Sequence, residues 1–400
     1  MHFPALSDGY AYLDGAGGTQ MPEAVIEAMA DASRRGLANV GGVFPASDRA
    51  DSAVEECRAA IADLVSGEPA GVVLGPNMTT LTYRVASALS KQWAPGDEVI
   101  VTQLDHDANI RPWIQAADRV GAVVRWATID TSTGDLPTEQ FQALVNGKTR
   151  LVAVTAASNL TGIKPNVAEI AAIAHNHRAL LFVDGVHATA HQVTDIRALG
   201  ADFYATSAYK WYGPHVGAII ADPGLLERFE PDKLLPQSDV VPERYEWGTP
   251  SFANLVGVAA AVDELASLSG DIGTRRERIR QAMGTVEQRE QTLFLDLLKG
   301  LSELPSVSLY GQSSFRAPTA FFRVADLTPQ QLAGALARRQ VNVWHGDNFA
   351  IELCRALGLD QTGGAVRASL AIYNQAEDVH RLVAAVGEIV DSLATSRHRE

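Results

Sequence analysis

A lysine between two aromatic side chains is the strongest candidate for a nucleophile in the sequence. Residues 205–214 read ATSAYKWYGP, in which Lys210 lies between Tyr209 and Trp211, three positions after Ser207. A lysine amine in a partly dry, aromatic pocket loses its proton more readily and becomes a usable nucleophile. A lysine that extends from a strand end into water would leave the same local pattern. The segment alone leaves both interpretations open.

An aspartate directly follows four apolar residues in the motif LLFVDGVH. This residue, Asp184, would lie at the carboxyl end of a buried strand. A carboxylate in that place can keep the ring nitrogen of a pyridine cofactor protonated, so that the ring accepts electrons from a substrate carbanion. An aspartate that only caps the following turn would look the same.

Three other turns after predicted strands carry polar side chains that could complete a site. In the motif GPNMTT, Met78 and Thr79 begin a helix whose free backbone N–H groups suit a phosphate. An ordinary helix cap explains Thr79 equally well. His106 and Asn159, in the motifs DHDAN and SNLTG, are each common turn residues by themselves. They become significant together with the other candidates, because each one follows a separate predicted strand of one sheet: Thr79, His106, Asn159, Asp184 and Lys210.

Alternating apolar and amphipathic segments between residues 70 and 222 indicate an α/β domain. The apolar segments predict buried strands at 72–74, 98–102, 123–127, 151–155, 180–183, 203–206 and 217–221. The amphipathic segments predict helices at 80–90, 109–120, 137–145, 167–176 and 195–199. The lengths of the connections indicate a seven-stranded, mostly parallel sheet, and ligands usually bind at the carboxyl ends of such strands.

The C-terminal third predicts a smaller α+β domain that closes over one edge of the larger one. Residues 253–304 read as a long helical stretch, with a solvated face formed by Arg275, Arg276, Arg278, Arg280, Glu287, Arg289 and Glu290. Further strands are expected at 306–310, 319–324, 341–344 and 365–372, and helices at 329–339 and 375–396. The cleft between two such domains is a usual place for a ligand.

Composition narrows the class of protein. The 400-residue chain carries a net charge of −14, which argues against nucleic acid or an anionic membrane as a partner. Two cysteines do not suggest a disulfide framework or a zinc cluster, and no metal ligands are expected. The sequence has neither a secretory signal pattern nor an apolar run long enough to span a bilayer, so we expect a cytoplasmic protein. The glycine-rich fingerprint of nicotinamide dehydrogenases is missing.

The motifs, taken together, resemble a known family. The spacing of Asn159, Asp184-x-x-His187 and Ser207-x-Tyr209-Lys210 is similar to the class V aminotransferases, which are fold-type-I pyridoxal 5'-phosphate (PLP) enzymes, on the cysteine desulfurase and selenocysteine lyase branch. The segments YLDGA, DHDANIRPW, GTP and VRASLAIYN match as well, so the resemblance covers nearly the whole chain. It implies a large PLP-binding domain at 15–265 and a small domain made of 1–14 and 266–400.

The resemblance also implies roles for individual residues. Lys210 would carry PLP as a Schiff base and later move the Cα proton, Asp184 would pair with the pyridine nitrogen, and His106 would stack on the ring. Arg367 would bind the substrate carboxylate. The remaining cofactor contacts, to the phenolic oxygen or the phosphate, would come from Asn159, His187, Met78, Thr79, Ser207, Tyr209 and Thr249. Thr249 would reach the phosphate across the interface of a homodimer.

This chain departs from the family pattern in two places. Tyr209 stands where the family often has histidine, and His187 stands where it often has glutamine. The loop WHGDNFA lacks the nucleophilic cysteine of true cysteine desulfurases, and its His345 and Asp347 would instead face the substrate. Cys354 follows on a helical, apolar spacing that is more typical of a core residue. The sequence therefore resembles a cysteine desulfurase-like subgroup that lacks the catalytic cysteine.

We therefore expect a PLP-dependent enzyme that acts on an α-amino acid, either an aminotransferase or a carbon–sulfur lyase. An epimerase is an alternative, because the same carbanion can be reprotonated on its opposite face. A cofactor-binding protein without turnover is another, although a degenerate protein should have lost some of the cofactor residues. The sequence does not identify the amino acid.

Overall fold

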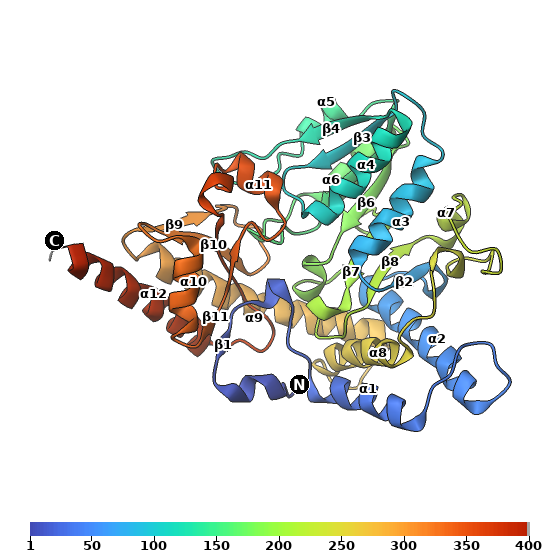
Figure 1. Cartoon of the computed structure of the whole chain (residues 1–400), viewed down its shortest axis with the longest axis horizontal. Coiled ribbons are helices and arrows are strands. Elements are labelled where there is room, and N and C mark those ends of the chain that lie inside the picture. Colours follow the sequence, from blue (N-terminus) through green and yellow to red (C-terminus); the bar gives the residue numbers. More distant parts are fainter. Residues whose placement is uncertain (398–400) are drawn as a thin grey trace.

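A seven-stranded sheet forms the centre of the computed structural model, which describes residues 1–397 (Figure 1). Across the sheet, the strands are β2 (Val72–Gly75), β8 (Gly217–Ala221), β7 (Phe203–Ser207), β6 (Leu180–Asp184), β5 (Thr149–Thr155), β3 (Glu98–Thr102) and β4 (Val123–Ala127). Only β8 runs opposite to the other strands of this sheet. The predicted mostly parallel sheet is confirmed, and each strand lies within two residues of its expected bounds.

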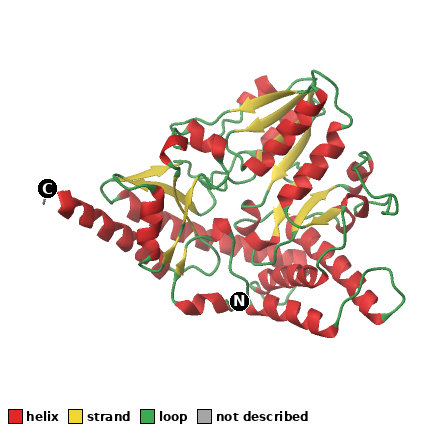
Figure 2. Ribbon diagram, viewed as in Figure 1, coloured by secondary structure: helices red, strands yellow, loops and turns green. Residues whose placement is uncertain are grey.

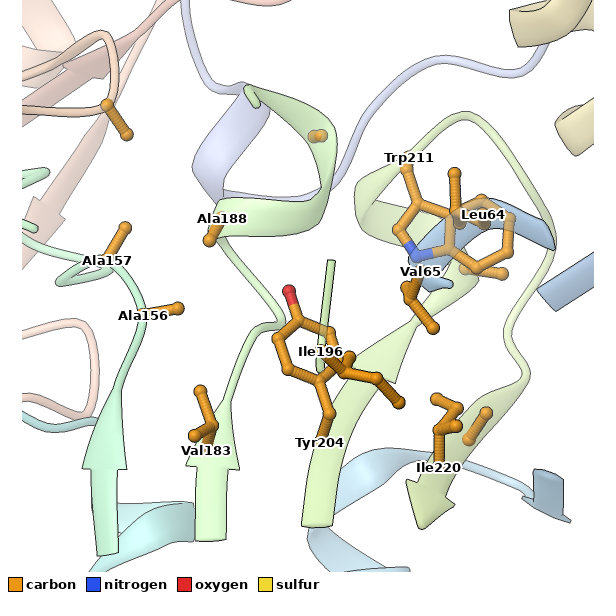
Figure 3. Close-up of a cluster of buried hydrophobic side chains, with 14 of the residues drawn as sticks. Leu64, Val65, Ala156, Ala157, Val183, Ala188, Ile196, Tyr204, Trp211 and Ile220 are labelled. Carbon is orange, nitrogen blue, oxygen red and sulfur yellow. The ribbon is translucent and has the colours of Figure 1, made fainter. Parts of the chain in front are cut away.

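Helices cover both faces of this sheet (Figure 2). The helices of this part of the chain are α1 (Glu23–Arg35), which packs on α8, α2 (Pro45–Val65), α3 (Met78–Ser90), α4 (Arg111–Val120), α5 (Gln140–Leu144), α6 (Val167–Asn176), α7 (Pro223–Glu227) and α8 (Phe252–Ser267). Side chains alternate between the faces with a period of two, so Val152 packs into one apolar cluster and Ala153 into the other. Figure 3 shows part of the first cluster, where Tyr204 lies beside Val183 and Ile220 of the neighbouring strands.

A second, antiparallel sheet forms from the C-terminal part of the chain. Its strands are β12 (Trp344–Gly346), β13 (Ala365–Ser369), β10 (Thr319–Val324) and β9 (Val307–Tyr310). The helices of this part are α9 (Arg275–Ser302), α10 (Pro329–Ala337), α11 (Ile351–Ala356) and α12 (Ala376–Arg397). Near the amino terminus, β1 (Ala11–Tyr12) pairs in parallel with β11 (Val341–Asn342). This pairing joins the N-terminal segment to the C-terminal part of the chain.

Several expected elements differ from those in the structure. Residues 341–344 do not form one strand, because Val341 pairs with β1 while Trp344 pairs with β13, in a different sheet. The expected helix at 195–199 is a turn: Asp195 Oδ1 accepts the N–H groups of the two residues at 197 and 198, and Gly200, at φ 67°, ends it. The stretch at 253–304 is two helices separated by a loop.

Candidate active site

A cavity of about 850 Å³ lies at the carboxyl ends of the parallel strands, between the two sheets. This volume falls within the range of small-molecule sites. The lining includes nearly all of the predicted site residues: Lys210, Asp184, His106, Met78, Thr79, Asn159, His187, Ser207, Tyr209, Arg367, Asp347 and His345. Thr249 is the exception, since it lies on an exposed loop outside the cavity of this chain. Its expected role depends on a second subunit.

Asp184 provides a buried carboxylate at the end of β6. Its Oδ1 accepts the backbone N–H of Val186 at 2.9 Å. Burial raises the pKa of Asp184 to about 6, while the Val186 N–H and the nearby Lys210 ammonium oppose that rise. A buried carboxylate gains most from a cationic partner that shares its dry surroundings. A protonated ring nitrogen would be such a partner.

Lys210 ends the short 3-10 turn Ala208–Lys210 that follows β7. Its Nζ donates a hydrogen bond to the carbonyl oxygen of Ala16 and lies 4.8 Å from the centre of the Tyr209 ring. Burial lowers the pKa of Lys210 to about 7, the positive Arg367 lowers it further, and Asp184 opposes both. A large share of the amine is therefore neutral at neutral pH, as a nucleophile requires.

The start of α3 forms a cradle for an anion. Asn77 caps the helix, because its Oδ1 accepts the N–H of Thr80 at 2.8 Å. Ser207 Oγ lies 3.2 Å from the backbone nitrogen of Met78, so β7 places a hydroxyl at the helix start. A Cβ on Gly217 would come within 2.3 Å of the Asn77 carbonyl carbon, so glycine permits this close approach of the turn to β8. A helix amino terminus with added hydroxyls suits a phosphate.

His106 is a neutral imidazole in this cavity. Its Nδ1 accepts the N–H of Ala108 at 3.0 Å, which leaves the ring proton on Nε2. Burial lowers the pKa of His106 to about 4, and the positive charges of Lys210 and Arg367 act in the same direction. The ring stacks on Phe349 with centroids 5.5 Å apart and planes 27° apart.

A buried network fixes the turn that carries His106. Asp105 accepts hydrogen bonds from the Thr102 hydroxyl and, at 2.6 Å, from Asn109 Nδ2. Asn109 in turn accepts the indole N–H of Trp113 at 3.0 Å. Burial raises the pKa of Asp105 to about 8. Asp105 is part of the motif DHDAN, and in the structure its carboxylate orients the turn that carries His106.

Arg367 brings a buried positive charge to the cavity from β13, and the nearby Asp14 carboxylate offsets part of it. The residue is only 4% exposed. One of its terminal nitrogens donates to the carbonyl oxygen of Asn159 at 2.8 Å, and its Nε is sealed from solvent without a partner in the described chain. Burial lowers the pKa of Arg367 to about 10, so the guanidinium stays charged at neutral pH. Such a group is well suited to bind a carboxylate in bidentate fashion.

The loop at 344–350 is fastened to the large sheet. Asn159 Nδ2 donates to the carbonyl oxygen of Asn348 at 2.9 Å, and the Asp107 N–H donates to that of Phe349 at 2.7 Å. Both Asn348 and Phe349 have positive φ, at 47° and 61°. Phe349 remains 68% exposed, and His345 and Asp347 are also exposed where they line the cavity.

Neither cysteine lies in the lining of the cavity. Cys57 and Cys354 are both free and fully buried. Burial raises the pKa of Cys354 to about 12 and also raises that of Cys57. Both thiols are therefore protonated and shielded, which makes them poor nucleophiles.

Comparison with known proteins decides the family. The family model for aminotransferase class-V matches residues 11–382. The chain belongs to this family. It is 36% identical to an uncharacterized protein of Mycobacterium tuberculosis, over 96% of this chain and 97% of that one. It is also 32% identical to a cysteine desulfurase of Yersinia pestis, over 97% and 96% of the two chains.

Solved structures of cysteine desulfurases share the fold of this class V protein. The enzyme CsdA from Escherichia coli superposes with a TM-score of 0.86 at 28% identity, covering 98% of this chain and 97% of that chain. The apo enzyme from Thermococcus onnurineus superposes with a TM-score of 0.88 at 27% identity, covering 98% and 99%. Within residues 1–397, no helix combines the length and the apolar composition needed to cross a membrane.

Class V aminotransferases and cysteine desulfurases depend on PLP, and the residues of this cavity fit that cofactor. The start of α3 offers a place for a phosphate, and Asp184 offers a buried carboxylate for a pyridinium. Asn159 Oδ1 is sealed from solvent without a partner among the described residues, which is costly unless a ligand completes the site. The protein is thus a PLP-dependent enzyme of the class V, cysteine desulfurase-like group.

Sequence reasoning missed several residues that hold the site together. The N–H of Ala16 donates to Ser369 Oγ at 2.6 Å, which places the Ala16 carbonyl against Lys210. Glu290 was expected on a solvated face but is 1% exposed, and it lies 2.8 Å from His191 Nδ1. The i, i+4 spacing of His187 and His191 was the one available signal; a backbone carbonyl such as that of Ala16 leaves none.

Proposed function

We propose that this enzyme removes the Cα proton of an α-amino acid and completes either a transamination or a carbon–sulfur bond cleavage. One observation carries the proposal: a cavity lined by Lys210 and Asp184 also contains the buried guanidinium of Arg367, whose Nε has no hydrogen-bond partner among the described residues. This arrangement offers one group for an α-carboxylate and another for the adjacent proton. When bound, PLP supplies the electron sink that accepts the electron pair left as the Cα–H bond breaks.

The remaining steps fall to residues of the chain. Arg367 binds the α-carboxylate and thereby orients the Cα–H bond toward Lys210. The Lys210 amine, whose pKa burial lowers to about 7, takes that proton on Nζ and can return it. Asp184 would hold a proton on the pyridine nitrogen, and the neutral His106 would cover the ring. Lys210 is the residue that would carry the cofactor covalently.

The product formed after removal of the Cα proton would depend on the substrate side chain. In a transamination, Lys210 would move the Cα proton while the bound cofactor takes up the amino group, and a second keto acid would then accept that group. If a β-substituent leaves, His345 or Asp347 in the loop at 344–350 can protonate it, because both line the cavity. The proposed reaction forms no persulfide on the enzyme, because the thiols of Cys57 and Cys354 are buried away from the cavity.

We also propose that the enzyme is a cytoplasmic homodimer. Thr249 lies on an exposed loop, next to the half-exposed Trp247. The preceding segment exposes Leu234, Leu235 and Val240, of which Leu235 is 97% exposed. Apolar surface of this kind favours burial against a second copy, and the loop would then bring Thr249 to the phosphate in the other subunit.

The Cα proton provides the test, because every proposed outcome requires its removal. The holoenzyme is incubated in D2O with single amino acids and with cysteine conjugates, and Cα exchange is followed by NMR. We expect exchange with at least one compound, accompanied by a keto acid or by sulfide and pyruvate, and its loss in Lys210→Ala. Exchange that persists in Lys210→Ala would refute the assignment. The absence of exchange with every compound, despite bound PLP, would favour a cofactor-binding protein without turnover.

A further inference from the structure

His187 lies between the cofactor cavity and the small sheet. It follows β6 by three residues and is only 4% exposed, yet its ring lines the cavity. Its Nε2 lies 2.9 Å from Thr319 Oγ1, on β10. Within the described chain, Nδ1 has no hydrogen-bond partner and is not among the atoms sealed from solvent. One ring nitrogen therefore contacts the small sheet, and the other is reached from the cavity.

The hydrogen bonds available to the Thr319 hydroxyl determine which ring nitrogen of His187 carries the proton. The Thr319 side chain is fully buried, and His187 Nε2 is the one partner of its hydroxyl among residues 1–397. If Nε2–H donated to the hydroxyl, the hydroxyl proton would be buried without an acceptor. Leaving a buried donor unpaired is costly, whereas a hydroxyl oxygen without a second donor is common. The Thr319 O–H must therefore donate to Nε2.

The backbone of Thr319 is held in place by its neighbours, so its hydroxyl keeps one position relative to His187. Arg316 donates from Nη2 to the Thr319 carbonyl oxygen at 2.7 Å and from Nε to that of Thr161 at 2.7 Å. Thr319 also stands opposite Ser369 in the β10–β13 register. The same arginine thus ties β10 to a loop of the large sheet, so the hydroxyl is presented to His187 from a fixed backbone.

The surroundings of His187 also keep its ring neutral. Burial lowers the pKa of His187 well below its usual value. The positive charges of Arg367, Lys210 and Lys164 act in the same direction. The His191 ring meets His187 edge-on at 4.9 Å and is itself held by Glu290. A neutral imidazole that accepts at Nε2 has one proton left, and that proton is on Nδ1.

We infer that Thr319 is a positioning residue that fixes His187 as the Nδ1–H tautomer, so that the cavity receives a hydrogen-bond donor at this point. The ligand group that matches it is an oxygen with acceptor or anionic character. This inference rests on the proposed function where it assigns that oxygen to PLP, whose phenolic oxygen is such a group. Through Thr319, a strand of the small sheet sets the hydrogen bond that the cofactor receives.

Nitrogen NMR tests the tautomer without any turnover. The holoenzyme is labelled with 15N-histidine, and the His187 signals are assigned by their loss in His187→Gln. We expect an Nε2 shift typical of an unprotonated ring nitrogen and a protonated Nδ1. A protonated Nε2 in the unaltered enzyme would overturn the inference, whether or not the proposed reaction is correct.

Substitution of Thr319 provides a second measurement. Thr319→Val keeps the shape of the side chain and removes the hydroxyl, so we expect mixed His187 tautomers and an apparent PLP dissociation constant about two- to tenfold higher. Thr319→Ser should restore both properties. Thr149→Val, which removes a buried hydroxyl at the amino end of β5, is the control and should leave both unchanged. An unchanged tautomer and PLP affinity in Thr319→Val would refute the role; if that variant does not fold, the NMR of the unaltered enzyme decides.

Discussion

The charge on Arg367 costs the fold stability and gives the enzyme its carboxylate site. A pKa lowered from 12.5 to about 10 corresponds to about 3 kcal/mol at roughly 1.4 kcal/mol for each tenfold change. At neutral pH the guanidinium is charged in both the folded and the unfolded chain, so the full cost is present there. Replacing Arg367 with methionine removes this cost and loses one hydrogen bond to Asn159, worth about 1 kcal/mol. The free energy of unfolding of Arg367→Met should therefore be unchanged or about 1–2 kcal/mol higher.

The same substitution should nearly abolish turnover. A guanidinium and a carboxylate about 4 Å apart attract each other by about 4 kcal/mol in partly screened surroundings. Losing most of this attraction should lower kcat/KM by two to three orders of magnitude, at about 1.4 kcal/mol for each factor of ten. The loss should not extend to cofactor binding, because Arg367 is assigned to the substrate and not to PLP.

Three measurements on Arg367→Met separate these effects. Urea unfolding gives the stability, the absorbance of bound PLP gives the cofactor content, and kcat/KM is measured for an amino acid that shows Cα exchange. Arg367→Lys keeps the charge but not the planar guanidinium, so its kcat/KM should lie between those of the unaltered enzyme and Arg367→Met. A stable variant that retains kcat/KM within about fivefold would refute the assignment. A variant that loses activity only because it unfolds would show that the arginine is structural.

Four further predictions concern the cofactor, the thiols and the interface. The rate at which PLP attaches covalently to the apoprotein should rise with pH around 7, because the neutral form of Lys210 attacks and burial lowers its pKa to about 7; a rise only near pH 10, or a borohydride-trapped adduct on another lysine, would contradict this. Asp184→Ala should retain PLP but lose Cα exchange, because an unprotonated pyridine is a poor electron sink, and a variant that still exchanges would exclude the role. Mass spectrometry after incubation with cysteine should find no persulfide on Cys57 or Cys354, and both Cys→Ala variants should stay active. Thr249→Ala should bind PLP roughly tenfold more weakly in a dimer; an active, PLP-loaded monomer in sedimentation would count against this.

The sequence predicted the large sheet well because each of its strands carries a strong local signal. The segment that contains Asp184 is an uninterrupted apolar run closed by a polar residue, and such runs are typical of strands buried on both faces. Polar residues at the carboxyl ends of parallel strands must converge, which is why His106, Asn159 and Lys210 share a cavity. At the ends of these strands, the local sequence pattern is therefore sufficient to predict where the side chain lies in the folded protein.

The contacts that complete the site depend on tertiary structure and left no local pattern. Glu290 lies in a run of charged residues that is typical of a solvated helix face, yet α9 turns this one side chain toward His191. Val341 and Trp344 are close in sequence, but their strand partners lie in different sheets. Ser369 meets Ala16 only after the whole chain has folded. Such contacts follow from pairings between distant segments, which periodicity does not report.

The contact between Ala16 and Ser369 also limits when the active site can form during synthesis. These two residues are 353 positions apart, and the same contact places the Ala16 carbonyl against the Lys210 amine. When β8, the last strand of the seven-stranded sheet, leaves the ribosome, Ser369 has not yet emerged, so it does not yet hold the Ala16 carbonyl against Lys210. The strand that contributes Arg367 is also absent at that point. A nascent chain can therefore hold PLP early only in an incomplete pocket, and full reactivity must wait until β13 has left the ribosome.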